Sequence, residues 1–489
     1  MFFTLCRASR WARRGLALAL ATSLAAYTAA ITPDRKAALD HISAQSLQGH
    51  VSFLASDLLE GRDTPSRGLD IAAEYIASQF RRAGLKPAGD DGYFQTAHYV
   101  TTGQALDGVE LTVRAANSSL QIPKREMRIL AAGKAEFSDV TPLKISLDDV
   151  KPDLVAGRVL VVATKRRDAM AVLRKLKPSA VLLAYSSAGR APEVTERLED
   201  VEQRSVFPVI RVHSHDFFKL VEAAKPGAME VKLSLRLPPP VERPVNLRNV
   251  VGLLPGSDPT LGGTYVLISA HYDHLGMKPS GEGDLIFNGA NDDASGVASM
   301  IEMASALSAS TPAPRRSILF IAYFGEEKGL LGSRYYGRHP LFPLKKTVAD
   351  LNLEHLGRTD GPNGSLAGTA TMTGYGYSDI TTAFEMAGAA TGLKIYAPER
   401  NGDDYFARSD NQSLADQGVP AHTFLTAFEF PDYHKVGDEW NKIDYANLAK
   451  VNRAIALTVM MIADDPLPPH WNESSVKTEK YVKAWRELK

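Results

Sequence analysis

Histidine and acidic side chains gather at four places in the carboxyl-terminal half of the sequence, each at or beyond the end of an apolar run. They are His271 to His274 after YVLISA, Glu326-Glu327 after SILFIAYF, Glu354 in VADLNLEHLG, and Asp432 to His434 beyond AHTFLTA. Imidazole and carboxylate are ligands for zinc, and a catalytic zinc keeps one position open for water. Neighbouring carboxylates repel each other unless a cation lies between them. The pattern therefore predicts a metal centre.

The segment GANDDASG at 289–296 carries an acid suited to join two metal ions. Its glycines flank a turn that opens a helix, and the carboxylate of Asp292 at such a turn can bridge a pair of ions. Before this segment, His271 and Asp273 have the spacing HxD. His271 can ligate a metal ion with one ring nitrogen, while Asp273 hydrogen-bonds to the other ring nitrogen and fixes the tautomer. The sequence thus offers both a bridging ligand and an oriented histidine.

The pair Glu326-Glu327 has two separable uses. One glutamate can ligate, and its neighbour then faces the bound water and can take its proton as a general base. Each motif alone also has a structural explanation, since loop histidines, glutamates at a helix start and aspartate N-caps are common. Their joint occurrence in this order, each at a strand end, favours a catalytic centre over those explanations.

Apolar runs of strand length position these side chains. We expect strands at 265–270, 317–324, 348–357 and 421–427, and a helix at 295–308. Near-continuous apolar strands that alternate with helices indicate an α/β fold with a mixed, mostly parallel central sheet flanked by helices. In such sheets, ligands bind outside the carboxyl ends of the strands. The predicted metal centre lies at that edge.

Two regions before this sheet differ in character. Residues 36–95 are expected to be helical, because their apolar residues recur at helical spacing. From about 97 to 245, runs such as VELTVRA, GRVLVVAT and EVKLSLRL predict a small β-rich module with one helix at 168–177. The stiff segment Pro238–Pro240 is suited to its junction with the next part of the chain.

The first thirty residues have the parts of a secretory signal. Arg13 and Arg14 close a basic segment, an apolar run extends from Gly15 to Ala26, and small residues follow at 28–30. We expect cleavage there, which would make the mature chain an exported bacterial protein, periplasmic or extracellular, with no stable membrane insertion. The only cysteine, Cys6, lies in this signal, so the mature chain offers no thiolate to a metal.

The balance of charge argues against nucleic acid as a partner. Basic and acidic residues number 56 each, and removal of the signal with its four arginines leaves 52 basic against 56 acidic residues. Proteins that bind nucleic acid through bulk charge are strongly basic. At 489 residues the chain is long enough for two or three domains.

Together these residues resemble the secreted co-catalytic zinc aminopeptidase family, whose relatives include glutamate carboxypeptidases and glutaminyl cyclases. The matching blocks are HYDHLG at 271–276, NGANDDASGVA at 288–298, FGEEKGLLGS at 324–333, NLEHLGR at 352–358 and DYHKVGDEWNKIDY at 432–445. The resemblance implies a zinc exopeptidase-like fold and an enzyme that removes amino-terminal residues from peptides. It also implies two Zn²⁺ ions, with the ligands His271, Asp292, Glu327, Glu354 and His434.

Within that set, the resemblance implies that Asp292 bridges the two ions. His271 and Glu354 would complete one site, and Glu327 and His434 the other. The catalytic residues would be Glu326 as general base, Asp273 as the residue that orients His271, and Tyr433 as hydrogen-bond donor to the developing oxyanion.

The sequence departs from the family pattern at two positions. Glu354 stands where Asp is common, and Asn411 stands where His is frequent. Glutamate is one methylene longer and still ligates, so we expect altered geometry rather than loss of the ion. Ser409 and Asp410, in the segment ARSDNQ, match a motif that lines the same site in the family.

The resemblance also implies a domain organisation. The β-rich module resembles, in its placement and strand pattern, the protease-associated domain that many relatives carry at this point. The expected parts are a signal peptide at 1–30, a discontinuous zinc peptidase catalytic domain at 36–125 and 244–465, a protease-associated-like insert at 126–243 and a carboxyl-terminal tail at 466–489.

Three alternatives stay open at this point. A glutamate carboxypeptidase needs cations that hold the carboxylate of the substrate, and Arg358, Arg400 and Arg408 are candidates. Glutaminyl cyclases of the family typically bind one zinc and lack the insert, so this reading ranks lower. A catalytically silent binding protein on the same scaffold usually loses ligands, whereas all five ligand positions here carry competent residue types.

Overall fold

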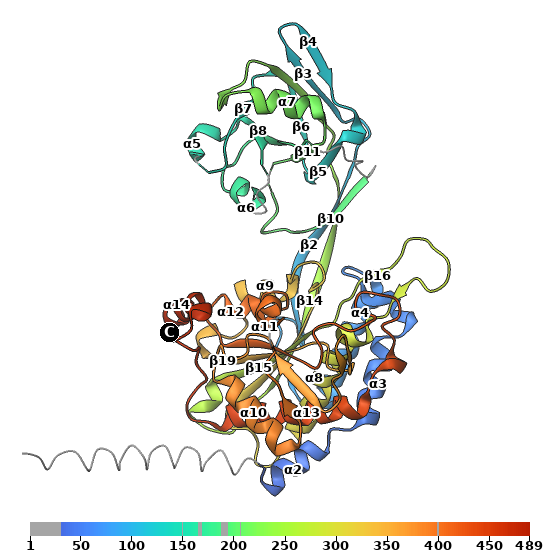
Figure 1. Ribbon diagram of the computed structural model, residues 1–489, viewed down its shortest axis with the longest axis vertical. Helices are drawn as coiled ribbons and strands as arrows, with labels where there is room; N and C mark the ends of the chain where they lie inside the picture. Colours follow the sequence, from blue (N-terminus) through green and yellow to red (C-terminus); the bar gives the residue numbers. More distant parts are fainter. Residues whose placement is uncertain (1–30, 149, 165–168, 187–193, 206, 399–400) are drawn as a thin grey trace, which may run out of the picture. The chain divides into compact units, whose positions relative to one another are not determined.

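The computed structural model describes residues 31–148, 150–164, 169–186, 194–205, 207–398 and 401–489 (Figure 1). The predicted signal peptide, residues 1–30, lies outside the described residues. The chain forms two compact units, one made of the residues up to Ala97 together with Leu247–Lys489, and one of His98–Asn246. Each unit is described by itself below.

A mixed β-sheet runs through the first unit, and its order is β2-β14-β18-β15-β19-β24-β22-β23. These strands are β2 (Phe94–Ala105), β14 (Val241–Leu254), β18 (Ser317–Tyr323), β15 (Tyr265–His271), β19 (Thr347–Leu353), β24 (Ala421–Leu425), β22 (Thr369–Met372) and β23 (Lys394–Ile395). The four central strands, β18, β15, β19 and β24, are mutually parallel, whereas β14 is antiparallel to β18 and β22 is antiparallel to β24. This arrangement confirms the predicted fold class.

The central strands are apolar because helices cover both faces of the sheet. Every residue of β18 and of β24 is buried, as is all of β15 after Tyr265. Along β15, Val266 and Ile268 face one layer of helices, while Leu267 belongs to the core on the other face. The four strands expected from the sequence are therefore all present, with ends that differ by at most a few residues from the expected ones.

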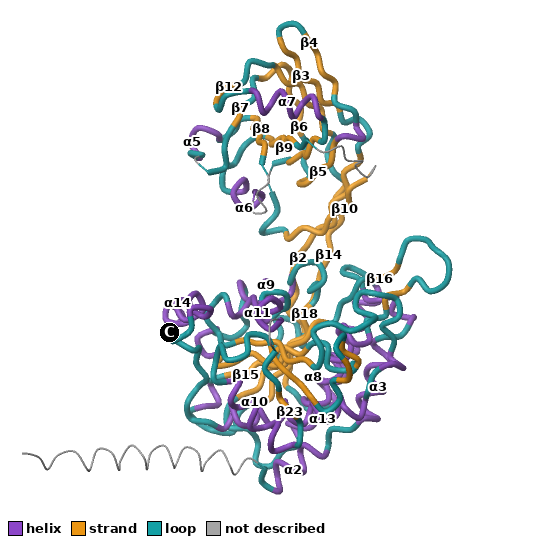
Figure 2. Tube along the Cα trace, viewed as in Figure 1, coloured by secondary structure: helices purple, strands orange, loops and turns teal. Residues whose placement is uncertain are grey.

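Figure 2 shows the helices of the first unit gathered around its strands. One group packs on α8 or α13 and comprises α2 (Pro33–Asp40), α3 (Ala44–Leu54), α4 (Arg67–Arg82), α8 (Ser295–Ser308), α10 (Ile380–Thr391) and α13 (Tyr445–Asp464). The opposite core includes residues of α9 (Leu331–Arg338), α11 (Asn401–Phe406), α12 (Asn411–Ala415) and α14 (Glu479–Leu488). Helix α13 is long and apolar enough to cross a membrane, but most of it is buried in this unit, as expected of a core helix.

Side-chain caps explain where several of these helices begin. Ser43 Oγ accepts a hydrogen bond from Ser46 N at the start of α3, and Ser66 Oγ accepts one from Leu69 N at the start of α4. Such caps satisfy N–H groups that have no partner within the helix. The helices predicted over 36–95 are thus confirmed as α2, α3 and α4.

The segment predicted as a carboxyl-terminal tail, residues 466–489, contributes to the core of the first unit. Trp471 is fully buried and its ring stacks on Tyr481 of α14, with ring centroids 4.9 Å apart. Trp471 Nε1 donates to the carbonyl of Gly418, 2.9 Å away. These contacts are buried aromatic packing with a satisfied indole N–H, so the segment is integral to the unit.

The second unit contains two β-sheets together with short helices. One sheet has the order β12-β7-β8-β9-β11-β5 and the other β4-β3-β13-β6. The bounds are β3 (Glu110–Ala115), β4 (Ser118–Gln121), β5 (Met127–Ala131), β6 (Ala135–Val140), β7 (Leu143–Lys144), β8 (Val159–Ala163), β9 (Ala180–Ala184), β11 (Val209–Val212), β12 (Gly227–Ala228), β13 (Lys232–Leu237), α5 (Pro152–Val155), α6 (Ala169–Arg174) and α7 (His215–Ala223). Strand β10 (Val194–Asp200) pairs with β2.

The ends of the second unit lie next to each other. His98 Nδ1 and Asn246 Oδ1 are 2.9 Å apart, although 148 residues separate them in the sequence. The unit begins at His98, before residue 126, the start proposed from the sequence, because β3 pairs within it with β13 and with β4. The domain boundaries, and the likeness of this unit to a protease-associated domain, stay proposals.

Candidate metal centre

The predicted ligands follow the carboxyl ends of three neighbouring strands. His271 is the last residue of β15, Glu326 and Glu327 follow β18, and Glu354 follows β19. Because β15 lies between β18 and β19 and is parallel to both, these ends share one edge of the sheet. The parallel order of the strands therefore brings side chains from distant parts of the chain together.

A first group of possible ligands consists of His271, Asp292 and Glu354. His271 Nε2 is 3.2 Å from Asp292 Oδ1 and 3.8 Å from Glu354 Oε1. One ligand atom from each of the three lies within 4.8 Å of the others, which is the spacing of atoms around one ion. The structure therefore places this predicted set as a group.

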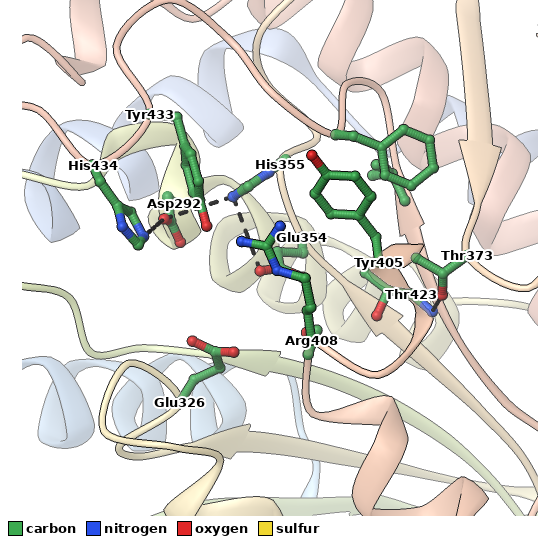
Figure 3. A pocket seen from close by; sticks show the side chains of 13 residues that line it. Asp292, Glu326, Glu354, His355, Thr373, Tyr405, Arg408, Thr423, Tyr433 and His434 are labelled. Atoms are coloured by element: carbon green, nitrogen blue, oxygen red, sulfur yellow. Dashed lines mark hydrogen bonds and ion pairs between the residues drawn. The ribbon is translucent and has the colours of Figure 1, made fainter. Parts of the chain in front are cut away.

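A second group shares Asp292 with the first. Glu327 and His274 offer ligand atoms that lie with Asp292 within 4.8 Å of one another. His434 Nε2 is also close, at 3.2 Å from Asp292 Oδ2 and 3.4 Å from Glu327 Oε2. Figure 3 shows His434 and His355 approaching Asp292 from two directions. Asp292 thus has the position expected of a bridging carboxylate.

Several polar atoms of these groups lack a hydrogen bond within the described residues. They are His271 Nε2, His274 Nδ1, His274 Nε2, Glu327 Oε1 and His355 Nε2, all of them buried. Buried polar atoms in native proteins are normally paired with protein or water. Cations among these nitrogen and oxygen atoms would satisfy them, and zinc accepts such a donor set without thiolates. The residues present therefore fit zinc.

The titration of the histidines reflects the density of negative charge. Burial lowers the pKa of His271, but Asp273, Asp292 and Glu354 outweigh burial and raise that pKa well above its usual value. Contacts with Asp292 and Glu327 raise the pKa of His434 to about 10. Such shifts show that the site holds excess negative charge, which a divalent cation neutralises.

Glu326 lies on the same pocket without joining either ligand group. Its backbone N–H donates to Asp273 Oδ1 over 3.0 Å, and its carboxylate faces the pocket across from Asp292 (Figure 3). Burial raises the pKa of Glu326 well above its usual value, and the charges of Glu354 and Asp410 add to this effect while that of His271 opposes it. A carboxylate of this kind can exchange a proton with a molecule bound in the pocket.

Asp273 connects the histidine to the glutamate segment. Its backbone carbonyl is 3.2 Å from His271 Nδ1, and its carboxylate Oδ1 is 3.6 Å from the same nitrogen. Thr64 Oγ1 donates to Asp273 Oδ2 over 3.1 Å. Both carboxylate oxygens are therefore held, and Asp273 positions the ring of His271 together with the backbone of Glu326.

Two residues that hold the site were not identified from the sequence. Asp438 accepts hydrogen bonds from the backbone N–H groups of Asn291 and Asp292, over 3.0 and 3.1 Å, and is fully buried. Arg62, also buried, donates to four backbone carbonyls, those of Leu54, Tyr272, Asn288 and Gly289. Asp438 lies in the matching block DYHKVGDEWNKIDY, which was the available signal, whereas Arg62 lies before all of the matching blocks.

His274 and His355 were also not assigned from the sequence, although they lie in the blocks HYDHLG and NLEHLGR. His355 Nε2 is 3.6 Å from Asp292 Oδ2. Burial lowers the pKa of His355, but Asp292 and other carboxylates outweigh it and raise the pKa to about 9. The centre therefore holds more imidazoles than the predicted ligand set.

The segment after α11 supports the floor of the site. Asn352 Nδ2 donates to Ser409 Oγ over 2.8 Å, and Thr423 Oγ1 donates to Asn411 Oδ1 over 2.9 Å. Burial raises the pKa of Asp410 to about 7. The side-chain oxygen of Asn411 is thus already the acceptor of a hydrogen bond from Thr423.

A pocket that is partly open to solvent lies beside the ligand groups. Its walls include Leu425, Phe428, Tyr405 and Tyr433, and the side chain of Arg408 reaches into it (Figure 3). The guanidinium of Arg408 stacks on the ring of Tyr405, 4.6 Å from its centroid. The pocket therefore combines apolar walls with the guanidinium of Arg408, as binding pockets commonly do.

The three arginines considered as carboxylate binders differ in their surroundings. Arg358 is paired with Asp360 and with Asp432, the latter over 2.9 Å, and is largely buried. Arg400 lies outside the described residues. Arg408 lines the pocket and makes no ion pair with any residue of the described part of the chain. Of the two arginines that the structure describes, Arg408 is the one available to a ligand.

Comparison with known proteins relates the part of the chain that carries this site to one peptidase family. Residues 249–459 match Peptidase family M28. A "Probable zinc metalloprotease" of Pyrenophora teres f. teres is 36% identical over 124 residues, which cover 25% of this chain and 25% of the relative. A "probable leucine aminopeptidase 2" of Aspergillus oryzae is 23% identical over 351 residues, covering 64% of each chain. The matches thus span a quarter to two thirds of these relatives.

A solved structure has the same fold. The "Aminopeptidase from Aneurinibacillus sp. strain AM-1" matches 91% of this chain and 98% of its own length, with a TM-score of 0.53 and 18% sequence identity. At that identity the likeness concerns the fold alone. Together with the family match, it confirms the resemblance seen in the sequence.

Proposed function

Because residues 249–459 match peptidase family M28, we propose that the protein is a zinc-dependent aminopeptidase with two metal ions. The observation that carries the proposal is the pair of ligand groups that share Asp292, with Glu326 on the same pocket. The names of the relatives support the choice of zinc and of peptide substrates.

The metal would be held by the predicted ligands. One ion would lie between His271, Asp292 and Glu354, and the other between Asp292, Glu327 and His434. When bound, zinc lowers the pKa of a coordinated water and polarises a carbonyl oxygen. The number of ions is part of the proposal.

The protein groups supply the remaining chemistry. Glu326 takes a proton from the water that attacks the scissile carbonyl, and it returns that proton to the leaving amine as the C–N bond breaks. The Tyr433 hydroxyl donates a hydrogen bond to the carbonyl oxygen as negative charge develops on it. Burial and the nearby carboxylates raise the pKa of Tyr433, so that its hydroxyl remains a donor at neutral pH.

Replacement of the general base tests the mechanism. Glu326→Gln should lower kcat by about 100-fold or more while both metals stay bound, because proton transfer is lost and the ligands are intact. Turnover of a peptide substrate is measured beside zinc content by elemental analysis. Unchanged turnover in a fully metallated Glu326→Gln protein would overturn the assignment of Glu326.

The direction of cleavage separates the candidate activities. Mature protein of known zinc content is incubated with a peptide that carries distinct residues at its two ends, and mass spectrometry follows which end shortens. Stepwise loss from the amino end, abolished by a chelator, is the expected result. The free Arg408 in the pocket favours a carboxypeptidase as the second candidate, and loss from the carboxyl end would establish it. Two bound zincs without cleavage would leave a narrow-specificity enzyme or a catalytically silent scaffold.

Export and the role of the second unit also belong to this proposal. The signal-like segment at residues 1–30 supports an exported, periplasmic or extracellular enzyme. We take the second unit to be a protease-associated-like module that is structural and binds no ligand of its own. Sequencing the amino terminus of the protein recovered from its host would test export.

A further inference from the structure

His274 occupies a position in the second ligand group that the family resemblance does not assign. Its Nδ1 atom is 2.8 Å from Glu327 Oε1 and 3.8 Å from Asp292 Oδ2. His274, Asp292 and Glu327 thus form a complete group of three ligand atoms within 4.8 Å of one another. His434 approaches the same two carboxylates from the other side, and the centroids of the two imidazole rings are 5.9 Å apart.

The contact between His274 and Glu327 is an ion pair that does not have hydrogen-bond geometry. His274 has no exposed surface, and neither of its ring nitrogens has a hydrogen-bond partner within the described residues. Glu327 Oε1, the atom that faces Nδ1, has none either. Leaving such buried atoms unpaired is costly, which makes an ion between them the simplest account of the arrangement.

The ring of His274 is held in this place by the backbone around it. The backbone N–H of His274 donates to the carbonyl of Arg62 over 3.2 Å. The ring also packs against Gly289, where an added Cβ would lie 2.5 Å from His274 Cγ. Gly289 has a φ of 59°, a conformation that favours glycine. The chain therefore leaves room for the imidazole next to the metal-binding turn.

We propose that His274 is a protein ligand of the second zinc ion. The proposal rests on the proposed function, which supplies the metal. The second ion would then have four protein ligands, and the first would have three. The two sets are His274, Asp292, Glu327 and His434 for the second ion, and His271, Asp292 and Glu354 for the first.

Unequal ligand sets give the two ions different tasks. Four protein ligands complete a tetrahedral site, as in structural zinc centres, whereas three leave a position for water. The open position would therefore lie at the ion held by His271 and Glu354, on the side of the pocket where Glu326 faces. The second ion would fix Asp292 and neutralise charge.

Two substitutions of His274 distinguish a role as zinc ligand from a role in which His274 only positions Glu327. His274→Asn places an amide nitrogen near the position of Nδ1, so it keeps a donor toward Glu327 but is a poor zinc ligand. His274→Ala removes both functions. If His274 ligates, both variants should lose the second zinc on dialysis, with an affinity loss beyond the about 10- to 100-fold that removal of an outer-shell partner causes. Full zinc retention by His274→Asn would show a positioning role and overturn the proposal.

A thiolate at the same position gives a direct spectroscopic test. The only natural cysteine, Cys6, lies in the predicted signal, so His274→Cys makes the sole thiol of the mature chain. In the cobalt-substituted protein, a residue that touches the metal should produce a thiolate-to-cobalt charge-transfer band. A cobalt-loaded His274→Cys protein without that band would refute ligation at this position.

Matched measurements keep this inference distinct from the proposed function. His50→Asn removes another buried histidine, one that contacts Tyr75 outside the site, and should retain both zinc ions. X-ray absorption should find three imidazoles for two ions in the wild-type protein and two in His274→Ala that is kept at two ions by excess zinc. Two bound zincs with His274 among their ligands but no peptide cleavage would remove the proposed function and leave this inference standing.

Discussion

Asp350 is a fully buried carboxyl group on β19, and its replacement by asparagine should stabilise the protein. Ser269 Oγ donates to Asp350 Oδ1 over 2.8 Å, while Oδ2 has no hydrogen-bond partner among the described residues. The hydroxyl groups of Tyr323 and Tyr336, both buried, also lack one there. Burial raises the pKa of Asp350 to about 8, with a contribution from Asp410 that Ser269 partly offsets. The native fold therefore holds this carboxyl group in its neutral form.

The size of the effect follows from the two pKa values. Below pH 3.8 the group is protonated in both states and costs nothing. Between that value and about 8 the native state keeps a proton that the unfolded chain has lost, so the free energy of unfolding falls by about 1.4 kcal/mol per pH unit. The accumulated cost is about 1.6 kcal/mol at pH 5 and about 4 kcal/mol at pH 7. Above pH 8 it levels off.

Asparagine removes this titration and keeps the useful contact. Its carbonyl oxygen can still accept from Ser269, and its amide can donate to a tyrosine hydroxyl. Asp350→Asn should therefore exceed the wild type in stability by an amount that grows from pH 5 to pH 8. Urea denaturation of zinc-loaded protein, followed by tryptophan fluorescence at several pH values, measures the difference. The exposed Asp404→Asn serves as control and should change stability by less than about 0.5 kcal/mol at every pH.

Two outcomes would refute this reasoning about Asp350. Parallel stability curves for Asp350→Asn and the wild type would show that the carboxyl group does not titrate between its unfolded and folded pKa values. A destabilised variant at pH 7 would show that the ionised form is the one that the fold prefers.

Two further substitutions test the support of the metal centre and the oxyanion donor. Asp438→Ala should destabilise the protein by about 3 kcal/mol or more, because two buried N–H groups lose a charged acceptor; urea denaturation measures this loss. The same substitution should displace Asp292 and so lower zinc occupancy, which elemental analysis measures. Tyr433→Phe should lower kcat by about 100- to 1,000-fold with unchanged zinc content, and an unchanged kcat in steady-state assays would exclude Tyr433 as oxyanion donor.

The sequence was sufficient for the fold because its strongest signal is local. The runs YVLISA and SILFIAYF are apolar throughout, and the structure uses them as β15 and β18, buried on both faces. The same runs predicted where His271 and Glu327 would lie, since parallel strands align their carboxyl ends. Residue type and strand position were therefore enough to predict a metal centre at this edge, whereas the ligand groups around Asp292 were implied by the family resemblance.

The supporting contacts could not be read in this way because they join distant segments. Asp438 binds the backbone of Asn291 and Asp292, which lie 147 and 146 residues before it. Arg62 reaches the carbonyls of Tyr272 and Gly289 across more than 200 residues. The partners of Asp438 and Arg62 are backbone groups, which every residue carries. The types of the residues in the sequence therefore do not predict these hydrogen bonds. His274 was not assigned a role from the sequence, because His271 as ligand and Asp273 as the residue that orients it already accounted for the block HYDHLG.

The hydrogen bond between His98 and Asn246 has a consequence for how the chain can be cut and rejoined. The side chains at the two ends of the second unit are 2.9 Å apart. The second unit is therefore a long insertion that leaves the first unit and returns to it at nearly the same point. The entropy of closing a loop rises only with the logarithm of its length. Exchanging this unit for another domain of similar length with adjacent ends therefore changes little in the entropy of closing the connection. Such a junction lets the unit be gained, lost or replaced while the metal centre keeps its geometry.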